Sequence, residues 1–236
     1  MSNKSSLLKI YENHPLDLKF RTFNSDINQQ LIFNEYKLLT QRCISGVYII
    51  PSANSPFLWN GVIFVQSGLY QGGIFKFSVY MDSNYGKSHI RPKILFDPIP
   101  FHPYVCPITG ELGNTEQAFP KWDCKKNNIY KMITFMKEAF DRFDADLENS
   151  RNPAAAQMYI DDYNEFTKCV DESVKESISD IMENRHSEDA HAIVFDKSCQ
   201  NMDKTKMLKF SSGRRHKFHK MQRSKSRCIV WRARAI

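Results

Sequence analysis

Four short strand-like runs follow one another in the first half of the chain, and their spacing restricts the fold more than any other feature. The runs cover residues 47–50, 58–66, 74–81 and 93–96. Clusters of Pro, Gly, Asn and Ser separate them, and such clusters favour turns and short loops. Short loops join antiparallel neighbours, whereas parallel neighbours need a long crossover. The sequence therefore predicts a four-stranded antiparallel meander.

The third of these runs indicates how the sheet is covered. Apolar side chains occupy every second position, at Phe75, Phe77, Val79 and Met81, with Lys, Ser and Tyr between them. Successive side chains of a strand point to opposite faces of the sheet, so the apolar set shares one face. This alternation predicts a sheet with one covered face.

Amphipathic helices are predicted before and after the meander. Apolar residues repeat at spacings of three and four over residues 27–42 and again over residues 129–143, as in helices with one apolar face. A third helix begins at Asn152, which can cap it, with Pro153 in its first turn. Its long apolar stripe extends to Ile181 and leaves room for a break. The fold class is therefore α+β, with an N-terminal helix, a four-stranded meander and C-terminal helices.

Charge is divided unevenly along the chain. Of its 33 Lys and Arg, 12 lie in residues 204–236, which contain no Asp or Glu, so the rest of the chain has 21 basic against 26 acidic residues. This pattern describes a basic tail on a mildly acidic body and not a basic binding face. We expect a loosely ordered segment at residues 1–26, a domain at 27–183, an extension at 184–203 and a disordered tail at 204–236.

The sequence predicts a soluble protein of the cytoplasm or the nucleus. No charge-free apolar run approaches the roughly 18 residues of a transmembrane helix, and no apolar segment that would suit a secretory signal follows the N-terminus. The six cysteines are then expected to be reduced. They lack the C-x-x-C spacing of zinc sites, and His186 and His191 beside Glu188 and Asp189 suit a solvated polar turn better than a metal site. We expect neither a metal nor a cofactor.

A turn motif follows the last strand-like run. It reads Phe101-His102-Pro103-Tyr104-Val105, and Gly110-Glu111-Leu112-Gly113 comes shortly after it. The arrangement resembles the active-site loop of the ubiquitin-conjugating enzymes. In that family a His-Pro-Asn turn precedes a Gly-x-x-Cys segment, whose Cys carries ubiquitin as a thioester. The resemblance aligns Tyr104 with the Asn and Gly113 with the Cys.

Further matches extend the resemblance over residues 27–143. Trp59 in the second strand, a Tyr-x-Gly-Gly-x-Phe-like signature that begins at Tyr70, and Lys121-Trp122 all have counterparts in the family. A narrower likeness is to the fused-toes branch, which includes AKT-interacting protein and the crossbronx proteins, and within it to the crossbronx-like proteins of insects. The residues that carry this likeness are Gly46-Val47-Tyr48-Ile49-Ile50-Pro51-Ser52, Gly61-Val62-Ile63-Phe64, Gly68-Leu69-Tyr70, Ala118-Phe119-Pro120-Lys121-Trp122 and the segment 189–195.

Thioester transfer needs two groups that the aligned loop lacks. The reaction uses a thiolate on an accessible loop and a hydrogen-bond donor for the developing oxyanion. By the resemblance, Gly113 stands in the place of the thiol, and His102-Pro103-Tyr104 is a degenerate form of the turn that supplies the donor. We therefore expect no catalytic residue, and we expect His102 to hold the loop by hydrogen bonds. Cys106 and Cys124 do not align with the family's nucleophile, so a relocated cysteine stays only as a residual alternative.

The resemblance implies a protein that works by binding other proteins. Members of the fused-toes branch are regarded as inactive variants that act with Hook-type coiled-coil adaptors, which link vesicles to microtubule motors. The implied partners are Hook-type coiled coils, ubiquitin bound without a covalent link, or an active conjugating enzyme. An alternative is a chromatin- or telomere-associated protein whose tail, residues 204–236, attracts polyanions without sequence preference. The residual alternative is a ubiquitin-conjugating cofactor, or an enzyme with a relocated cysteine.

Overall fold

The four strand-like runs form four antiparallel strands, as predicted. The strands are β1 (Val47–Pro51), β2 (Leu58–Phe64), β3 (Ile74–Tyr80) and β4 (Lys93–Phe96), and their order in the sheet is β1-β2-β3-β4. The register pairs Gly61 of β2 with Ile49 of β1 and Phe77 of β3. The predicted ends of the strands differ from the observed ones by no more than two residues.

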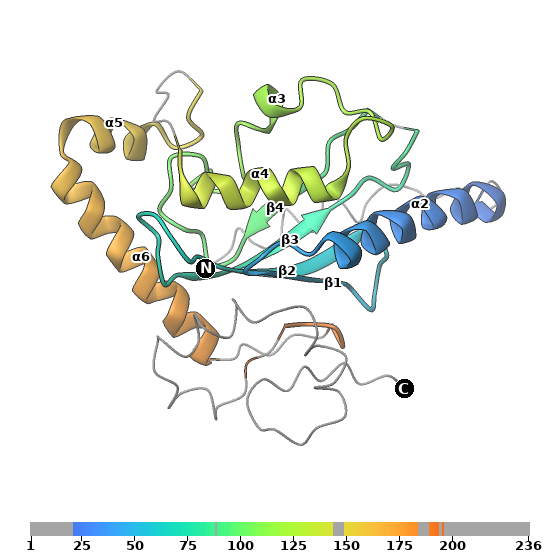
Figure 1. Cartoon of the computed structure of the whole chain (residues 1–236), viewed down its shortest axis with the longest axis horizontal. Helices are drawn as coiled ribbons and strands as arrows, with labels where there is room; N and C mark the ends of the chain where they lie inside the picture. Colours follow the sequence, from blue (N-terminus) through green and yellow to red (C-terminus); the bar gives the residue numbers. More distant parts are fainter. Residues whose placement is uncertain (1–20, 88, 144–148, 184–188, 194, 196–236) are drawn as a thin grey trace.

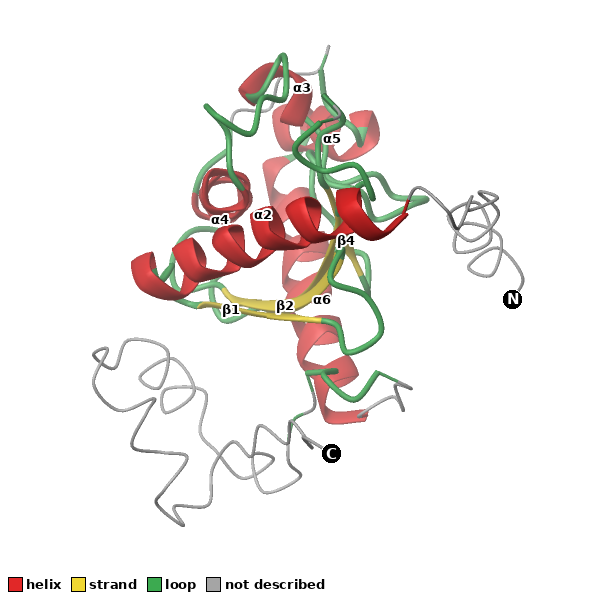
Figure 2. Cartoon of the chain, turned by 90° about the vertical axis from the view of Figure 1, so that its right-hand side faces the viewer, coloured by secondary structure: helices red, strands yellow, loops and turns green. Residues whose placement is uncertain are grey.

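The sheet lies at the centre of the part of the chain that the structure describes. This structure is a computed structural model, and it describes residues 21–87, 89–143, 149–183, 189–193 and 195. Helices lie on both sides of the sheet, which separates the upper helices of Figures 1 and 2 from the lower end of α6. The basic tail, residues 204–236, is outside the described residues.

Helices α2 (Arg21–Arg42) and α4 (Ile129–Asp141) cover the first face of the sheet (Figure 2). Apolar side chains of both helices meet alternate residues of the strands in one buried cluster. Its members include Ile32, Leu39, Trp59, Ile63, Phe75, Phe77, Val79, Ile94, Phe96, Ile129, Met132, Ile133, Met136 and Phe140. Helix α2 begins ahead of the predicted start at residue 27, because backbone hydrogen bonding continues a helix beyond its apolar stripe.

The second face of the sheet is also covered, so the prediction of one covered face was wrong. Val62, Phe64 and Ile74 point to this face and form a smaller buried cluster with Ile181 and Phe195. Ile181 belongs to helix α6 (Tyr163–Glu183), whose C-terminal part packs against the start of β3 through Ser177 and Asp180. The sequence pattern did not predict this contact between α6 and the sheet, because β3 has polar residues on this face.

The long C-terminal stripe is divided between two helices. Helix α5 (Pro153–Asp161) ends before Asp162, and α6 starts at Tyr163. The Asn152 side chain accepts a hydrogen bond from the backbone N–H of Ala155, and Pro153 stands in the first turn, which confirms the predicted cap. A four-residue helix, α3 (Thr115–Ala118), lies in the segment between β4 and α4. The predicted domain boundaries stay predictions.

Candidate functional site

The turn after β4 is held in place by the side chain of His102, which is fully buried. Its Nδ1 accepts a hydrogen bond from the backbone N–H of Tyr104 at 2.9 Å, and its Nε2–H donates to the backbone oxygen of Ala139 in α4 at 3.0 Å. A ring that accepts at Nδ1 and donates at Nε2 is a neutral imidazole. Burial lowers the pKa of His102 to about 4, and the hydrogen bond to Ala139 opposes this only in part. At neutral pH both ring nitrogens are engaged and the ring is uncharged.

Aromatic rings enclose the His102 imidazole. The Tyr70 ring stacks on it with a centroid distance of 4.9 Å, and the Phe140 and Phe143 rings each lie 5.0 Å away. The Tyr70 hydroxyl donates to the backbone oxygen of Phe101 at 2.7 Å. The Tyr-x-Gly-Gly signature and the His-Pro turn, which are separate motifs in the sequence, therefore meet in one packed unit.

Pro103 and Tyr104 join the turn to two other segments. The backbone oxygen of Pro103 accepts from the N–H of Asn152 at 2.9 Å and from the Ser150 hydroxyl at 2.6 Å, both just before α5. The backbone oxygen of Tyr104 accepts from the N–H of Gly113 at 2.6 Å. The sequence-predicted positions Tyr104 and Gly113 thus lie side by side.

Gly113 lies under the side chain of Arg151. A Cβ at Gly113 would overlap Arg151 Cγ and would lie 2.9 Å from Cβ and Cδ of the same residue. Gly113 itself is buried and its φ is outside the left-handed region, so a larger residue is opposed by the Arg151 side chain and not by backbone conformation. The aliphatic part of Arg151 fills the volume into which a side chain at position 113 would extend.

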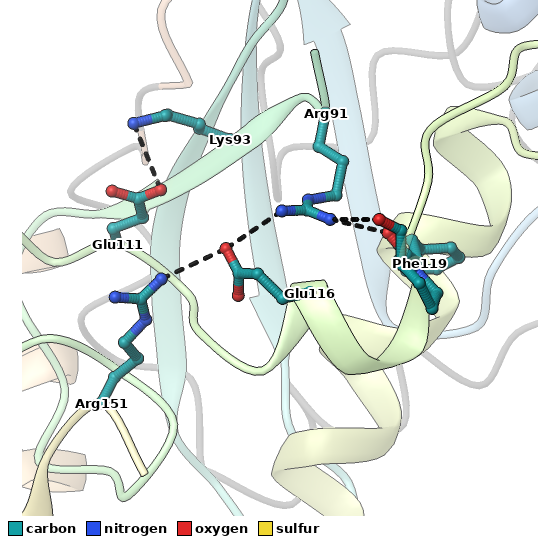
Figure 3. Close-up of polar contacts among 7 residues, drawn as sticks. Arg91, Lys93, Glu111, Glu116, Phe119 and Arg151 are labelled. Atoms are coloured by element: carbon teal, nitrogen blue, oxygen red, sulfur yellow. Dashed lines mark hydrogen bonds and ion pairs between the residues drawn. The ribbon is translucent and has the colours of Figure 1, made fainter. Parts of the chain in front are cut away.

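Glu116 holds the head group of Arg151 at this position (Figure 3). Its Oε1 lies 3.2 Å from Nη2 of Arg151 and 3.3 Å from Nη2 of Arg91. Arg91 in turn donates through Nη1 to the backbone oxygen of Phe119 at 2.7 Å. These contacts connect three segments: the residues before β4, helix α3 and the residues before α5.

The charged groups around the loop are only partly removed from water. The Arg151 and Glu116 side chains are 49% and 51% exposed, and a second pair, Lys93 with Glu111, has a distance of 3.4 Å with side chains 44% and 31% exposed. Exposed pairs of this kind contribute about 0–1 kcal/mol each. The pair of Arg151 with Glu116 holds Arg151 over Gly113.

Cys106 lies in the same loop, and its thiol is partly exposed. Burial raises the pKa of this thiol, but hydrogen bonds from Thr109 and Ile108 and the charge of Arg151 outweigh burial and lower the pKa overall. Cys124 is also partly buried, and it packs against the main core cluster.

The two residues that control access to Gly113 were missed by the sequence reasoning. Arg151 precedes the cap residue Asn152, and Glu116 begins the short helix α3. Neither belongs to a recognisable motif with Gly113. The hydrogen bond between Asn152 and Pro103 brings Arg151 to the loop, and that contact connects residues far apart in the sequence.

The polar residues near the end of the described chain lie elsewhere, on the second face of the sheet. Burial tends to raise the pKa of Asp189, but hydrogen bonds from Ser52, His191, Ala53 and Asn60 outweigh it and lower the pKa. His186 and Glu188 are outside the described residues. Among the residues that the structure describes, no three or more His, Cys, Asp or Glu side chains gather as metal ligands do, and no helix is long and apolar enough to span a membrane.

Comparison with known protein families gives a match over more than half of the chain. The family described as "Ubiquitin-conjugating enzyme" matches residues 31–174. A solved structure titled "Novel Ubiquitin-Conjugating Enzyme" has a similar fold, with a TM-score of 0.51 and 22% identity over 60% of this chain and 91% of that one.

Comparison with curated proteins identifies more similar sequences. AKT-interacting protein homolog B of Xenopus laevis is 38% identical over 161 residues, which cover 68% of this chain and 54% of that protein. AKT-interacting protein of Mus musculus is also 38% identical, with the same coverage. Protein crossbronx of Drosophila persimilis is 33% identical over 171 residues, 70% of each chain. The matched region spans about half the length of the AKT-interacting proteins.

Proposed function

Because this chain belongs to the ubiquitin-conjugating enzyme family, with AKT-interacting protein and crossbronx of the fused-toes branch among its homologues, we propose that it is a non-enzymatic variant that acts by binding other proteins. The observation that carries the proposal is the arrangement at Gly113. By the family resemblance this position corresponds to the thioester-forming cysteine, and the stem of Arg151 fills the space beside it.

The rest of the loop supports the same proposal. An oxyanion donor must point at the atom that develops charge. His102 has both ring nitrogens in hydrogen bonds within the protein, and Tyr104 packs its ring against His102 and Phe143. The turn therefore has a structural role, in which it packs between β4, α4 and α5. Under this proposal the protein functions by binding partners and not by catalysis.

The partners that we propose follow from the relatives. AKT-interacting protein is named for an interaction with AKT, and this favours a protein partner. By resemblance to the fused-toes branch, we propose an adaptor in vesicle trafficking that binds Hook-type coiled coils. Affinity capture with the intact chain and with a chain that ends at residue 203, followed by identification of the captured proteins, tests this proposal. Recovery of coiled-coil adaptors by both chains is expected; recovery of nucleic-acid-binding proteins by the intact chain alone would favour the chromatin alternative.

The absence of catalysis has a direct test. The protein is incubated with ubiquitin-activating enzyme, ATP and ubiquitin, and the products are separated on a non-reducing gel, with an active conjugating enzyme as the positive control. We expect no adduct that a reducing agent removes. Matched variants Cys106→Ser and Cys124→Ser accompany the unaltered chain.

A second candidate function is conjugation through Cys106. It is favoured by the lowered pKa of that thiol and by its position in the same loop as Gly113. Under this alternative, a thioester band would form with the unaltered chain and with Cys124→Ser, and would be lost in Cys106→Ser. That result would replace the proposal of a non-enzymatic protein.

A further inference from the structure

Residues 189–193 and Phe195, which come after α6 in the chain, lie against the second face of the sheet. We call residues 189–193 together with Phe195 the strap, and we call the surface made by Tyr48, Val62, Phe64 and Ile74 the outer face. Phe195 is 2% exposed, and it packs into the outer face beside Ile181 of α6. Its ring meets that of Phe64 edge-on at 6.2 Å.

The other end of the strap is anchored by one carboxylate. Asp189 Oδ1 accepts from the backbone N–H of Ala53 at 3.0 Å, and Oδ2 accepts from the Asn60 side-chain amide at 2.8 Å. The Ser52 hydroxyl supports the same carboxylate, and the Ser52 residue is 7% exposed. The two residues that follow β1 and Asn60 of β2 thus direct three donors toward a single negative charge, which is a strong arrangement for binding a carboxylate.

Between the two ends of the strap, a histidine side chain makes a further contact with the sheet. The His191 Nδ1–H donates to the backbone oxygen of Pro51 at 2.9 Å. The strap therefore contacts the sheet through four side chains: a carboxylate, an imidazole, the Phe195 ring and the partly buried Ile193. Recognition through spaced side chains is how a folded domain binds a short peptide motif, whereas an added strand is held by its backbone.

From this arrangement we propose that the outer face is a peptide-binding site, that it recognises a segment of the form Asp-x-His-x-x-x-Phe, and that the strap is its intramolecular ligand. The site has an apolar end at Phe64 of the outer face, and the neighbouring Ser52, Ala53 and Asn60 add a polar end to it. While the strap is bound, an external peptide of the same form must compete with it. Because the strap is tethered, its effective concentration is in the millimolar range, so a strap with an intrinsic Kd of about 10–100 μM weakens external binding by roughly ten- to a hundredfold.

The test uses the full chain with the strap disabled and adds the strap sequence as a separate molecule. The variant Asp189→Ala/Phe195→Ala removes both anchors from the strap and leaves the outer face unchanged. A fluorescent peptide of residues 187–197 is titrated into this variant and into the unaltered chain, and binding is followed by anisotropy. The peptide should bind the variant at least about tenfold more tightly than the unaltered chain.

Two matched controls locate the interaction. A peptide carrying Asp189→Ala should bind the anchor-free variant about tenfold more weakly, and so should the normal peptide when Asn60→Leu is added to the protein. Equal affinity for the variant and the unaltered chain would overturn the proposal. So would the absence of binding to a variant that melts as cooperatively as the unaltered chain.

Global unfolding of the double variant would show that the strap is an integral part of the core, and would also overturn the proposal. The single variant Asp189→Ala separates loss of the anchor from loss of the Phe195 ring. With the ring kept, this variant should stay folded and bind the peptide with an affinity between those of the other two proteins.

Discussion

Replacement of Gly113 by alanine measures how firmly Arg151 closes the space beside it. The added Cβ would overlap Arg151 Cγ, so the arginine must leave its rotamer. This displacement costs about 0.5–1.5 kcal/mol for an unfavourable side-chain conformation. It also weakens the ion pair with Glu116, which is half exposed and contributes about 0.2–1 kcal/mol. We therefore expect Gly113→Ala to lower the free energy of unfolding by about 1–2 kcal/mol.

Urea unfolding followed by tryptophan fluorescence provides the measurement, because Trp59 and Trp122 are fully buried. A double-mutant cycle with Arg151→Ala isolates the contact between the two positions. In the Arg151→Ala background the cost of Gly113→Ala should fall to less than half, with only the Arg151 Cβ contact left. If Gly113→Ala is as stable as the unaltered chain, or costs the same in both backgrounds, Arg151 does not close this position.

Two titratable groups give further predictions. The pKa of His102 is depressed in the folded chain, so its contribution to stability is present above its ordinary pKa and is lost as the pH falls toward 4. Between pH 7 and pH 4, urea unfolding should show that the free energy of unfolding falls by about 3 kcal/mol because of His102. This fall should be absent in His102→Gln. If the free energy of unfolding changes equally with pH in both proteins, His102 is not the buried neutral group described above. Burial raises the pKa of Glu35, whose carboxylate accepts from the Tyr85 hydroxyl and from the N–H of Ile129, each at 2.9 Å. The protonated Glu35 carboxyl therefore stabilises the folded chain in acid, and this contribution is lost as the pH rises through its folded pKa. At pH 7 Glu35→Gln should be at least as stable as the unaltered chain, and the same comparison in acid should show no such advantage.

The order and pairing of the strands followed from the sequence because local patterns specify them. Turn-forming residues separate the strands, and the cap at Asn152 is a contact between residues three apart. The covered second face did not follow, since β3 presents Lys76 there and a charged residue usually indicates solvent. In the folded chain Lys76 Nζ lies 3.2 Å from Asp180 of α6, whose side chain is 5% exposed. A helix that carries the opposite charge can cover a polar strand face. The alternation of polar and apolar residues along β3 does not show that Lys76 has such a partner.

The candidate site was predictable only in part, because only some of its residues are close together in the sequence. The His-Pro turn and Gly113 are close in sequence, and the motif places them in one loop. The contact that defines the site depends on Arg151, which reaches the loop through the hydrogen bond from Asn152 to Pro103. Such a contact between distant segments is set by tertiary packing, which a single sequence does not specify.

The coupling among these contacts bears on what a restored thiol would do. Under the proposed function, Gly113→Cys places sulfur in a volume that Arg151 occupies, and Arg151 cannot leave without giving up Glu116. Removal of Arg151 opens the volume but supplies no oxyanion donor, because the Tyr104 ring packs on Phe143 and the Tyr104 backbone oxygen is bonded to the N–H of Gly113. We therefore expect Gly113→Cys and Gly113→Cys/Arg151→Ala to form no thioester in the gel assay, and only a variant that also carries Tyr104→Asn to form one. A thioester on Gly113→Cys alone would mean that the single missing thiol, and not the packing of the whole loop, separates this chain from an active enzyme.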